Sequence, residues 1–470
     1  MGLRDFHRVH NAYYFDNMLR NKGNSKWGII SVGLSEAYRK VYTELKVQDS
    51  LYSVVSKKPN GLSKIRVIGS ILDCLQAPDE MERVIKLIGS NDIKMVSLTI
   101  KESNYHFNSH FTALNVDHPF IQYDLISTSK PPRTPVGLLI KGLHLRYKQK
   151  GKPLSILCLD NLLRGGEITR VMVETFAVHR YPLDTGFHTW LHENIFYPNS
   201  VCDRICLTDP LADSIALQQI AGVRDRALVT TESFKDWAIE KWMGDKPEGM
   251  DDTVRFVNST IPFENLKIRL NYGTRLSVAV VAYSLGYTKF EDALRDPAVL
   301  RFMHAYMNEV GLGLGTSMPP EINLEEYKEA LVVRMATKQL KYMTRRVVED
   351  ASTKLLMDMK PVLESLPPNA PTKAIGVVVA AWANLLAATP SVQSSAFHPL
   401  IDHKNDVLEP IAKRLVHSAK GADVAHASEE FLSAVFGKDA KFNNALSADV
   451  VTALQRIETL GIKDAINKIC

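Results

Sequence analysis

The sequence predicts an α/β domain over residues 1–257, followed by an all-α domain over residues 258–470. A chain of 470 residues exceeds what one hydrophobic core usually organises, so two domains of about 200 to 250 residues each are expected. In the first part, short apolar runs alternate with amphipathic stretches. Beyond residues 244–262, a stretch holding several Gly, Pro and Asp residues, strand-like runs nearly vanish.

The strands expected in the first domain are short and apolar, and helical stretches separate several of them. This alternation is typical of βαβ units and predicts a largely parallel sheet. The predicted strands are residues 27–32, 51–55, 65–71, 94–100 and 155–159, and the clearest helices are residues 6–19, 78–88 and 135–149.

The second domain is expected to consist of helices. Residues 276–285 form an apolar helix that ends at Gly286, and residues 324–350 carry a long amphipathic pattern. Residues 374–388 are the most apolar run, but the run is too short to span a membrane and contains Asn384. We therefore interpret it as a buried helix.

The composition is that of an ordinary globular protein. Hydrophobic residues make up 45% of the chain and charged residues 23%, and the formal net charge is only +5. Basic and acidic residues are interspersed rather than gathered in blocks. Neither nucleic-acid binding nor membrane insertion is predicted.

The five cysteines, an odd number in a long chain, favour thiols in a reducing intracellular compartment, either the cytoplasm or an organelle matrix. Cys202 and Cys206 lack further ligands nearby, and His7 and His10 have no carboxylate or cysteine beside them. We expect the histidines to pack or cap, and we predict no metal site. The cysteines are Cys74, Cys158, Cys202, Cys206 and Cys470.

Lys267 stands directly before an apolar helix, where an ammonium is costly to bury. One interpretation is a general base, because burial favours the neutral lysine that can take a proton from a hydroxyl. The other is a lysine whose stem covers apolar surface while its head stays in water. The sequence around Lys267 favours the second interpretation when taken alone.

Short motifs along almost the whole chain agree in order and spacing with one known family. They comprise Phe6, Arg8, His10, Ala12, Tyr14 and Asp16, residues 27–29, 96–100, 159–161, 197–205 and 262–270, Arg334, and residues 350–354 and 435–437. In these motifs the chain resembles the long-chain polyol dehydrogenases, which include mannitol 2-dehydrogenase, arabinitol dehydrogenase and the hexuronate reductases.

The resemblance implies a Rossmann-like first domain and zinc-independent hydride transfer between NAD or NADP and a polyol or its ketose. Lys267 matches the family's general base, and Asn161 matches the first of two asparagines that stabilise the developing alkoxide. Glu36 could contact the adenosine ribose, although a solvated loop carboxylate fits equally well. Cofactor contacts are expected at Gly2, Phe6, Arg8, Glu36, Thr99 and Asp203, and substrate contacts at Arg334 and Lys354.

Two catalytic positions depart from the family pattern. The pattern has an asparagine five residues after the lysine and a histidine three residues later, whereas this chain has Tyr272 and Arg275. The ungapped register continues through Gly273, so a shift does not bring Asn271 into the asparagine position. The expected set of groups at the reacting centre is thus half replaced.

The N-terminal turn departs as well. Arg4 replaces the second glycine of the turn, where a pyrophosphate needs close backbone approach, although its guanidinium could pair with the phosphates instead. The strand that leads into this turn in the family is absent, and it would lie centrally in the sheet. We expect unpaired strand edges there, filled either by residues upstream of Met1 or by a partner in a larger assembly.

Two functions remain open on these grounds. If Tyr272 fills the substrate space and Arg275 places a fixed charge there, the protein is a catalytically impaired pseudoenzyme kept as a structural or assembly component, and it needs no cofactor. This is the main expectation. Alternatively, both side chains act as donors, Arg275 favours neutral Lys267 and binds an anionic substrate such as a uronate or sugar phosphate, and the enzyme is active.

Overall fold

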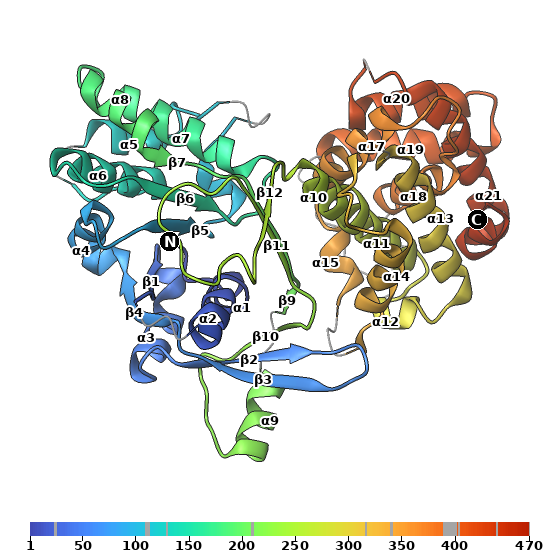
Figure 1. Cartoon of the computed structure of the whole chain (residues 1–470). Coiled ribbons are helices and arrows are strands. Elements are labelled where there is room, and N and C mark those ends of the chain that lie inside the picture. Colours follow the sequence, from blue (N-terminus) through green and yellow to red (C-terminus); the bar gives the residue numbers. More distant parts are fainter. Residues whose placement is uncertain are drawn as a thin grey trace. The chain divides into compact units, whose positions relative to one another are not determined.

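The computed structural model describes residues 1–22, 26–108, 113–127, 130–207, 211–314, 317–338, 342–388, 402, 405–438 and 440–469. The chain forms two compact units. Unit 1 contains Met1–Lys58 and Leu62–Ile261, and unit 2 contains Pro262–Cys470 with the short segment Pro59–Gly61. The first unit is α/β and the second is helical, as the sequence predicts (Figure 1).

Unit 1 is built around short parallel strands. β1 pairs in parallel with β4, and β5 pairs in parallel with β6, which pairs in parallel with β7. Every residue of β6 is buried, because helices pack against the strands in one hydrophobic cluster. The strands are β1 (Ile29–Gly33), β4 (Ile71–Gln76), β5 (Met95–Leu98), β6 (Leu154–Cys158) and β7 (Ile195–Phe196).

The helices of unit 1 begin and end close to the predicted places. The predicted helix over residues 6–19 is divided at His10, and the other two lie within one residue of the predicted bounds. The helices are α1 (Asp5–Val9), α2 (Asn11–Lys22), α3 (Arg39–Val47), α4 (Ala77–Gly89), α5 (Pro119–Ile126), α6 (Pro135–Lys148), α7 (Gly165–Arg180), α8 (Thr185–Asn194) and α9 (Leu211–Ala221), with short 3₁₀ turns η1 (Glu36–Tyr38) and η2 (Glu102–Tyr105).

Further strands in unit 1 add antiparallel pairs, which the prediction of a largely parallel sheet did not include. β2 pairs antiparallel with β3, β10 with β9, and β11 with β8. The predicted strand over residues 65–71 is confirmed for residues 65–68, which belong to β3, but it ends before Gly69, whose N–H donates to Asp16. These strands are β2 (Tyr52–Lys57), β3 (Ser63–Ile68), β8 (Ser200–Asp203), β9 (Cys206–Leu207), β10 (Val229–Glu232), β11 (Asp236–Glu240) and β12 (Arg255–Val257).

The edges of β1 and β5 that face away from β4 and β6 pair with no other strand of the described part of the chain. The prediction of unpaired strand edges is therefore confirmed at β1 and β5. Met1 and Gly2 lie between the two edges, since the Met1 amine donates to Ser97 O at 2.6 Å and the Gly2 N–H donates to Val32 O at 2.8 Å.

Unit 2 is a helical unit around one large apolar core. Helix α18 covers the apolar run of residues 374–388 and is buried over most of its length, as predicted. Its described helices are α10 (Ile261–Asn265), which begins one residue before the unit, α11 (Gly273–Ser284), α12 (Phe290–Ala293), α13 (Pro297–Leu314), α14 (Leu324–Met335), α15 (Thr344–Val348), α16 (Ala351–Lys354), α17 (Lys360–Ser365), α18 (Lys373–Ala387), α19 (Asn405–His417), α20 (Val424–Phe436) and α21 (Asn443–Ile469), with π-helical segments η3 (Leu266–Tyr272) and η6 (Leu355–Met359) and the 3₁₀ turn η8 (Ser418–Lys420).

The amphipathic pattern over residues 324–350 does not form one helix. It gives α14 and α15, and residues 339–341 between them lie outside the described residues. The break has a backbone cause: Tyr342 O accepts the N–H of Phe290, and the Thr344 N–H donates to Thr288 O, both at 3.0 Å. These groups are thereby withdrawn from helical hydrogen bonding.

Within the described residues no helix is long and apolar enough to cross a membrane. Four of the cysteines carry thiols rather than disulfides, and Cys470 lies outside the described part of the chain. No cluster of three or more metal-ligating side chains is found in the described ranges.

Candidate functional site

The turn at the chain start has a shape that requires glycine. Gly2 has φ +100°, and a Cβ added there would lie 2.2 Å from the backbone oxygen of Thr99. The Thr99 hydroxyl donates to Gly2 O at 2.7 Å and so fixes the turn at the end of β5. Gly2 and Thr99, both predicted as cofactor residues, are therefore brought together at the carboxyl end of the parallel strands.

Arg4 precedes α1 and extends towards Asp160, at the carboxyl end of β6. Its Nη1 lies 3.8 Å from Asp160 Oδ1, and the Arg4 side chain remains 32% exposed. Asp160 also accepts the N–H groups of Ile100 and Lys101. Burial raises the pKa of Asp160 to about 6, so the carboxyl is mostly ionised at neutral pH and pairs with the guanidinium.

Three other predicted cofactor residues serve the interior of unit 1. Arg8 is buried and donates to Asp5 Oδ1 at 2.5 Å and to the backbone oxygen of Ala227. The Phe6 ring stacks on His10 at 5.1 Å between centroids. Asp203 is buried in β8. These contacts stabilise the segment that carries the turn, and the assignment of the three residues to cofactor binding stays a prediction.

Glu36 follows β1 and is exposed, where a ribose-binding carboxylate is expected in a Rossmann-like fold. Arg39 donates to both Glu36 oxygens, at 2.7 and 2.6 Å, and also to Asp79. These bonds hold the pKa of Glu36 below its usual value. A carboxylate and a guanidinium thus stand together at the end of β1.

The two N-terminal histidines pack, as expected. His7 Nε2 lies 2.7 Å from Ser31 Oγ, and burial lowers the pKa of His7 to about 3. His10 contacts the rings of Tyr14 and Trp237, at 4.9 and 5.4 Å between centroids. Neither histidine belongs to a metal-ligating cluster among the described residues.

Asn161 lies on an exposed bend after β6, next to Asp160. Its backbone N–H donates to Glu102 Oε1 at 3.3 Å. Because parallel strands end at one edge of a sheet, Asn161 shares this edge with Thr99 and the Gly2 turn. The structure therefore brings the predicted catalytic asparagine to the same edge as the turn.

In unit 2, Lys267 lies in the π-helical segment η3 and is only 6% exposed. The expectation of a lysine head left in water is wrong, since tertiary packing encloses the side chain. A π-helix places residues i and i+5 one above the other. Accordingly, Lys267 Nζ lies 5.5 Å from the centroid of the Tyr272 ring.

Arg275 joins the same cluster from the first turn of α11. Its guanidinium carbon lies 4.4 Å from the Tyr272 ring centroid. It donates to the Tyr342 hydroxyl and, at 3.1 Å, to Asn271 Oδ1. Tyr272 and Asn271 thus flank Lys267 and Arg275 on neighbouring turns.

Asn271 and Tyr342 are members of this cluster that the sequence did not assign to the site. Asn271 was set aside because the register points to Tyr272, yet it is buried and bonded to Arg275. A π-helix has no sequence signature that would have placed both residues beside the lysine. Tyr342 comes from a separate segment, and no sequence motif links it to Lys267.

The charge around Arg275 is only partly balanced. Arg275 Nε is buried without a hydrogen-bond partner among the described residues. Asp358, in η6, is buried, and burial raises its pKa to about 7 despite the nearby charges of Arg275 and Lys354. The raised pKa favours the neutral carboxyl, so Asp358 compensates the cations incompletely.

The two predicted substrate residues of unit 2 are both poorly exposed. Arg334, at the end of α14, is 6% exposed rather than solvated. Lys354 donates to the backbone oxygens of Val347, at 2.7 Å, and Glu349, and burial lowers its pKa. Lys354 thus ties α16 to the end of α15.

The residues of unit 1 fit a dinucleotide. Gly2 makes a tight turn against Thr99, since an added Cβ would meet the Thr99 backbone, and a tight glycine turn before a helix is the usual setting for a pyrophosphate. Arg4 adds a positive charge at the same turn, and Glu36 stands at the end of the next strand. Arg4 therefore adds charge complementary to phosphate at the turn where the family has glycine.

Sequence comparison finds family matches and relatives that cover almost the whole chain. The Mannitol dehydrogenase Rossmann domain family matches residues 1–248, and the Mannitol dehydrogenase C-terminal domain family matches residues 260–458. Mannitol 2-dehydrogenase of Emericella nidulans is 30% identical over 470 residues, which cover 98% of this chain and 90% of that relative.

Solved structures agree with the sequence comparison. The crystal structure of a substrate-free D-sorbitol dehydrogenase matches with a TM-score of 0.84 and 25% identity, over 99% of this chain and 93% of that one. Pseudomonas fluorescens mannitol 2-dehydrogenase, solved as a ternary complex with NAD and D-mannitol, matches with a TM-score of 0.82 and 26% identity, over 99% and 92% of the two chains. The chain therefore belongs to the mannitol dehydrogenase family.

Proposed function

We propose that the protein is an active, zinc-independent, NAD(P)-dependent dehydrogenase that interconverts a polyol and its ketose. The observation that carries this proposal is the burial of Lys267 on a π-helix beside the phenol of Tyr272 and the guanidinium of Arg275. A buried amine next to hydrogen-bond donors suits removal of a hydroxyl proton and stabilisation of the resulting oxyanion.

The chain's own residues divide this work. Lys267 takes the proton of the substrate hydroxyl, and the donors of Tyr272 and Arg275 stand in for the family's asparagine and histidine. Asn161, on the other unit, retains the amide that the family uses as a donor to the alkoxide. The bound nicotinamide supplies the hydride acceptor, and the Gly2 turn with Arg4 and Glu36 would hold the dinucleotide.

The pseudoenzyme role expected from the sequence receives no support from the comparisons, which favour the alternative of an active enzyme. The relatives named above are dehydrogenases matched over nearly the whole chain. The ring of Tyr272 lies near both Lys267 and Arg275, Arg275 is hydrogen-bonded to Tyr342 and Asn271, and side chains able to donate are kept at both substituted positions. A role in a larger assembly is therefore not proposed.

Anionic sugars are the favoured substrate class within this proposal. Arg275 and Arg334 are cationic residues of unit 2, and the charge of Arg275 is felt at Asp358 and that of Arg334 at Arg275. Because burial raises the pKa of Asp358, this carboxyl offsets the positive charge of Arg275 and Arg334 only in part. A uronate carboxylate or a sugar phosphate would complement that charge.

Two measurements test the proposal. NADH and NADPH are titrated against the full chain while nicotinamide fluorescence is recorded, and saturable binding is expected. Mannitol, arabinitol, fructuronate and their phosphates are then assayed with both cofactors, and turnover is expected with at least one, with the higher kcat/KM for an anionic member. A folded chain that binds neither nucleotide would refute the proposal.

The role of Arg275 is tested on the same substrates. Arg275→Met keeps much of the side-chain volume and removes the charge, so kcat/KM for an anionic sugar should fall about tenfold or more, and less for a neutral polyol. Equal losses for charged and neutral substrates would leave the dehydrogenase proposal standing but refute the preference for anions.

A further inference from the structure

Asp160 joins the ends of two neighbouring strands in unit 1. It lies two residues after β6, and its side chain is only 5% exposed. Its Oδ2 accepts the Ile100 N–H at 2.8 Å, and its Oδ1 accepts the Lys101 N–H at 3.1 Å. The loop after β5 is thereby fastened to the residue that immediately precedes Asn161.

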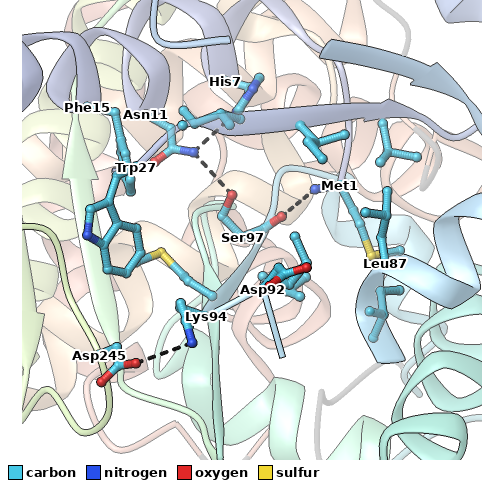
Figure 2. Close-up of a pocket in the computed structure, with 18 of the residues that line it drawn as sticks. Met1, His7, Asn11, Phe15, Trp27, Leu87, Asp92, Lys94, Ser97 and Asp245 are labelled. Carbon is cyan, nitrogen blue, oxygen red and sulfur yellow. Dashed lines mark hydrogen bonds and ion pairs between the residues drawn. The ribbon is translucent and has the colours of Figure 1, made fainter. Parts of the chain in front are cut away.

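The loop after β5 also contacts the backbone of Asn161. Glu102, in η2, accepts the Asn161 N–H through its Oε1 at 3.3 Å. The strand before the loop is held from α2, since Asn11 Nδ2 donates to Ser97 Oγ at 3.1 Å (Figure 2). Because β5 is anchored in this way, the hydrogen bonds to Asp160 determine how the loop continues from it.

The backbone of this loop is strained at Lys101. Lys101 has φ +73° and ψ 149°, a conformation that residues other than glycine rarely adopt, and His106, directly after η2, has φ +52°. Such conformations persist only where the surrounding structure enforces them, and they are concentrated at binding and catalytic sites. Here the hydrogen bonds to Asp160 enforce the conformation at Lys101.

Tyr105 holds the Asp160 carboxylate from the interior. The Tyr105 side chain is fully buried, and its hydroxyl donates to Asp160 Oδ2 at 3.1 Å and lies 3.0 Å from Cys158 Sγ. Because a carboxylate only accepts, the Cys158 thiol is left to donate to the phenol oxygen. Burial raises the pKa of this thiol to about 12, so it keeps its proton. The row of donors ends on Asp160 and stabilises its charged form.

The charge of Asp160 depends on these bonds. Burial raises the pKa of Asp160 to about 6, and the negative charge of Glu102 adds to this shift. The hydrogen bonds from Ile100, Lys101 and Tyr105 oppose it, so loss of any one of them would raise the pKa further. The other charged or titratable groups that face Asp160 in the described part of unit 1 are the Arg4 guanidinium, the Tyr38 phenol, the Cys158 thiol and the Met1 amine.

We propose that Asp160 and Tyr105 are positioning residues, which place Asn161 for contact with the developing alkoxide by fixing the loop after β5 against the end of β6. Arg4, whose Nη1 lies 3.8 Å from Asp160 Oδ1, brings the Gly2 turn to the same carboxylate. Asp160 and Tyr105 act through these neighbours and need no contact with the substrate. Because Asn161 has this role only in a dehydrogenase, the proposal rests on the proposed function.

Tyr105→Phe in the full chain tests the proposal, because it removes only the hydroxyl and so raises the pKa of Asp160. Relative to wild type, kcat should fall about three- to tenfold at pH 6 but less than about twofold at pH 9, where Asp160 is ionised in both proteins. The ratio of the two rates at each pH removes what other titrating groups contribute to both proteins. The segment 99–106 should also lose protection from hydrogen exchange at pH 6.

Tyr52→Phe is the matched control, because Tyr52 is also buried in unit 1 but its hydroxyl donates to Arg8 O, at 2.7 Å. Its rate relative to wild type should be the same at both pH values. Asp160→Asn cannot ionise, so its kcat should be about tenfold or more below wild type at pH 6 and at pH 9 alike.

A rate ratio for Tyr105→Phe that is the same at both pH values would overturn the proposal, because a merely structural loss does not follow the ionisation of Asp160. Wild-type turnover in Asp160→Asn would overturn it as well. A wild type that turns over no substrate would instead refute the proposed function, and the positioning role with it.

Discussion

The two units carry their departures from the family in different physical forms. In unit 1, Arg4 stands two residues from Gly2, and the turn keeps its shape because backbone geometry enforces it. In unit 2, the exchanged side chains of Tyr272 and Arg275 rebuild the surroundings of Lys267 with new contacts. The comparison teaches that steric constraints hold the Gly2 turn, whereas side-chain contacts hold the residues around Lys267.

Lys267→Ala has the largest expected effect and separates turnover, assigned to Lys267 of unit 2, from cofactor binding, assigned to unit 1. Loss of the general base should lower kcat by about 10²- to 10⁴-fold, since general-base catalysis contributes in that range. NADH affinity should stay unchanged, because Lys267 belongs to unit 2. Steady-state kinetics and the fluorescence titration measure the two effects on one preparation.

Lys328→Ala is the matched control, because Lys328 is also buried in unit 2 but bonds to Asn308 and Glu325. Activity per folded molecule should survive this change. Undiminished turnover in Lys267→Ala would mean that the lysine is not the base.

Gly2→Ala tests the claim that steric constraints hold the turn at the chain start. The added Cβ would lie 2.2 Å from Thr99 O at a positive φ, so the turn must shift. We expect NADH affinity to fall by about tenfold or more, with a lower melting temperature. Gly222→Ala is the control, because Gly222 also has positive φ but has no neighbour within 4 Å of the added Cβ. An equal loss of NADH affinity in both variants would contradict the steric account.

Glu36→Gln should change the choice of cofactor. Glu36 shares Arg39 with Asp79, and removing its charge leaves the guanidinium better able to meet a 2′-phosphate. The ratio of NADPH to NADH affinity should rise by roughly tenfold. Asp92→Asn, at an exposed carboxylate outside these contacts, should leave the ratio unchanged. No change in Glu36→Gln would remove Glu36 from the ribose site.

Asp358→Asn should change stability and its dependence on pH. The folded-state pKa of about 7 lies above the ordinary 3.8, so ionisation in the unfolded chain makes the wild type less stable as pH rises from about 4 to about 7. The variant should lose this dependence and gain about 4 kcal/mol relative to wild type at pH 8 compared with pH 4, since each pKa unit corresponds to about 1.4 kcal/mol. Denaturant unfolding at both pH values measures this difference, and a constant difference would contradict it.

Much of the fold could be predicted from the sequence because the apolar patterns carry it. The buried helix over residues 374–388 and the parallel strands around residues 94–100 and 155–159 follow from local patterns. The antiparallel pairs and the break in residues 324–350 could not be predicted. They depend on backbone bonds between distant segments, such as that of Phe290 with Tyr342.

The candidate site, like the fold, has features that the sequence predicts and others that depend on contacts between distant residues. Gly2, Asn161 and Lys267 could be located, since family spacing fixes their places on the chain. The burial of Lys267 and the bond from Arg275 to Asn271 could not, because they depend on a π-helix that the sequence does not mark. The exchange at Tyr272 and Arg275 therefore looked more damaging in the sequence than in the structure.

The central claim is that the protein transfers a hydride from its substrate to the nicotinamide, with Lys267 as the general base. The most direct test follows a deuterium label. A polyol or sugar acid that the substrate assay identifies is deuterated at the carbinol carbon and incubated with the full chain and NAD or NADP, and the reduced cofactor is analysed by mass spectrometry. We predict that one deuterium moves to the nicotinamide with the wild type and almost none with Lys267→Ala. Absence of transfer from every deuterated substrate, in a protein that binds the cofactor saturably, would contradict the account.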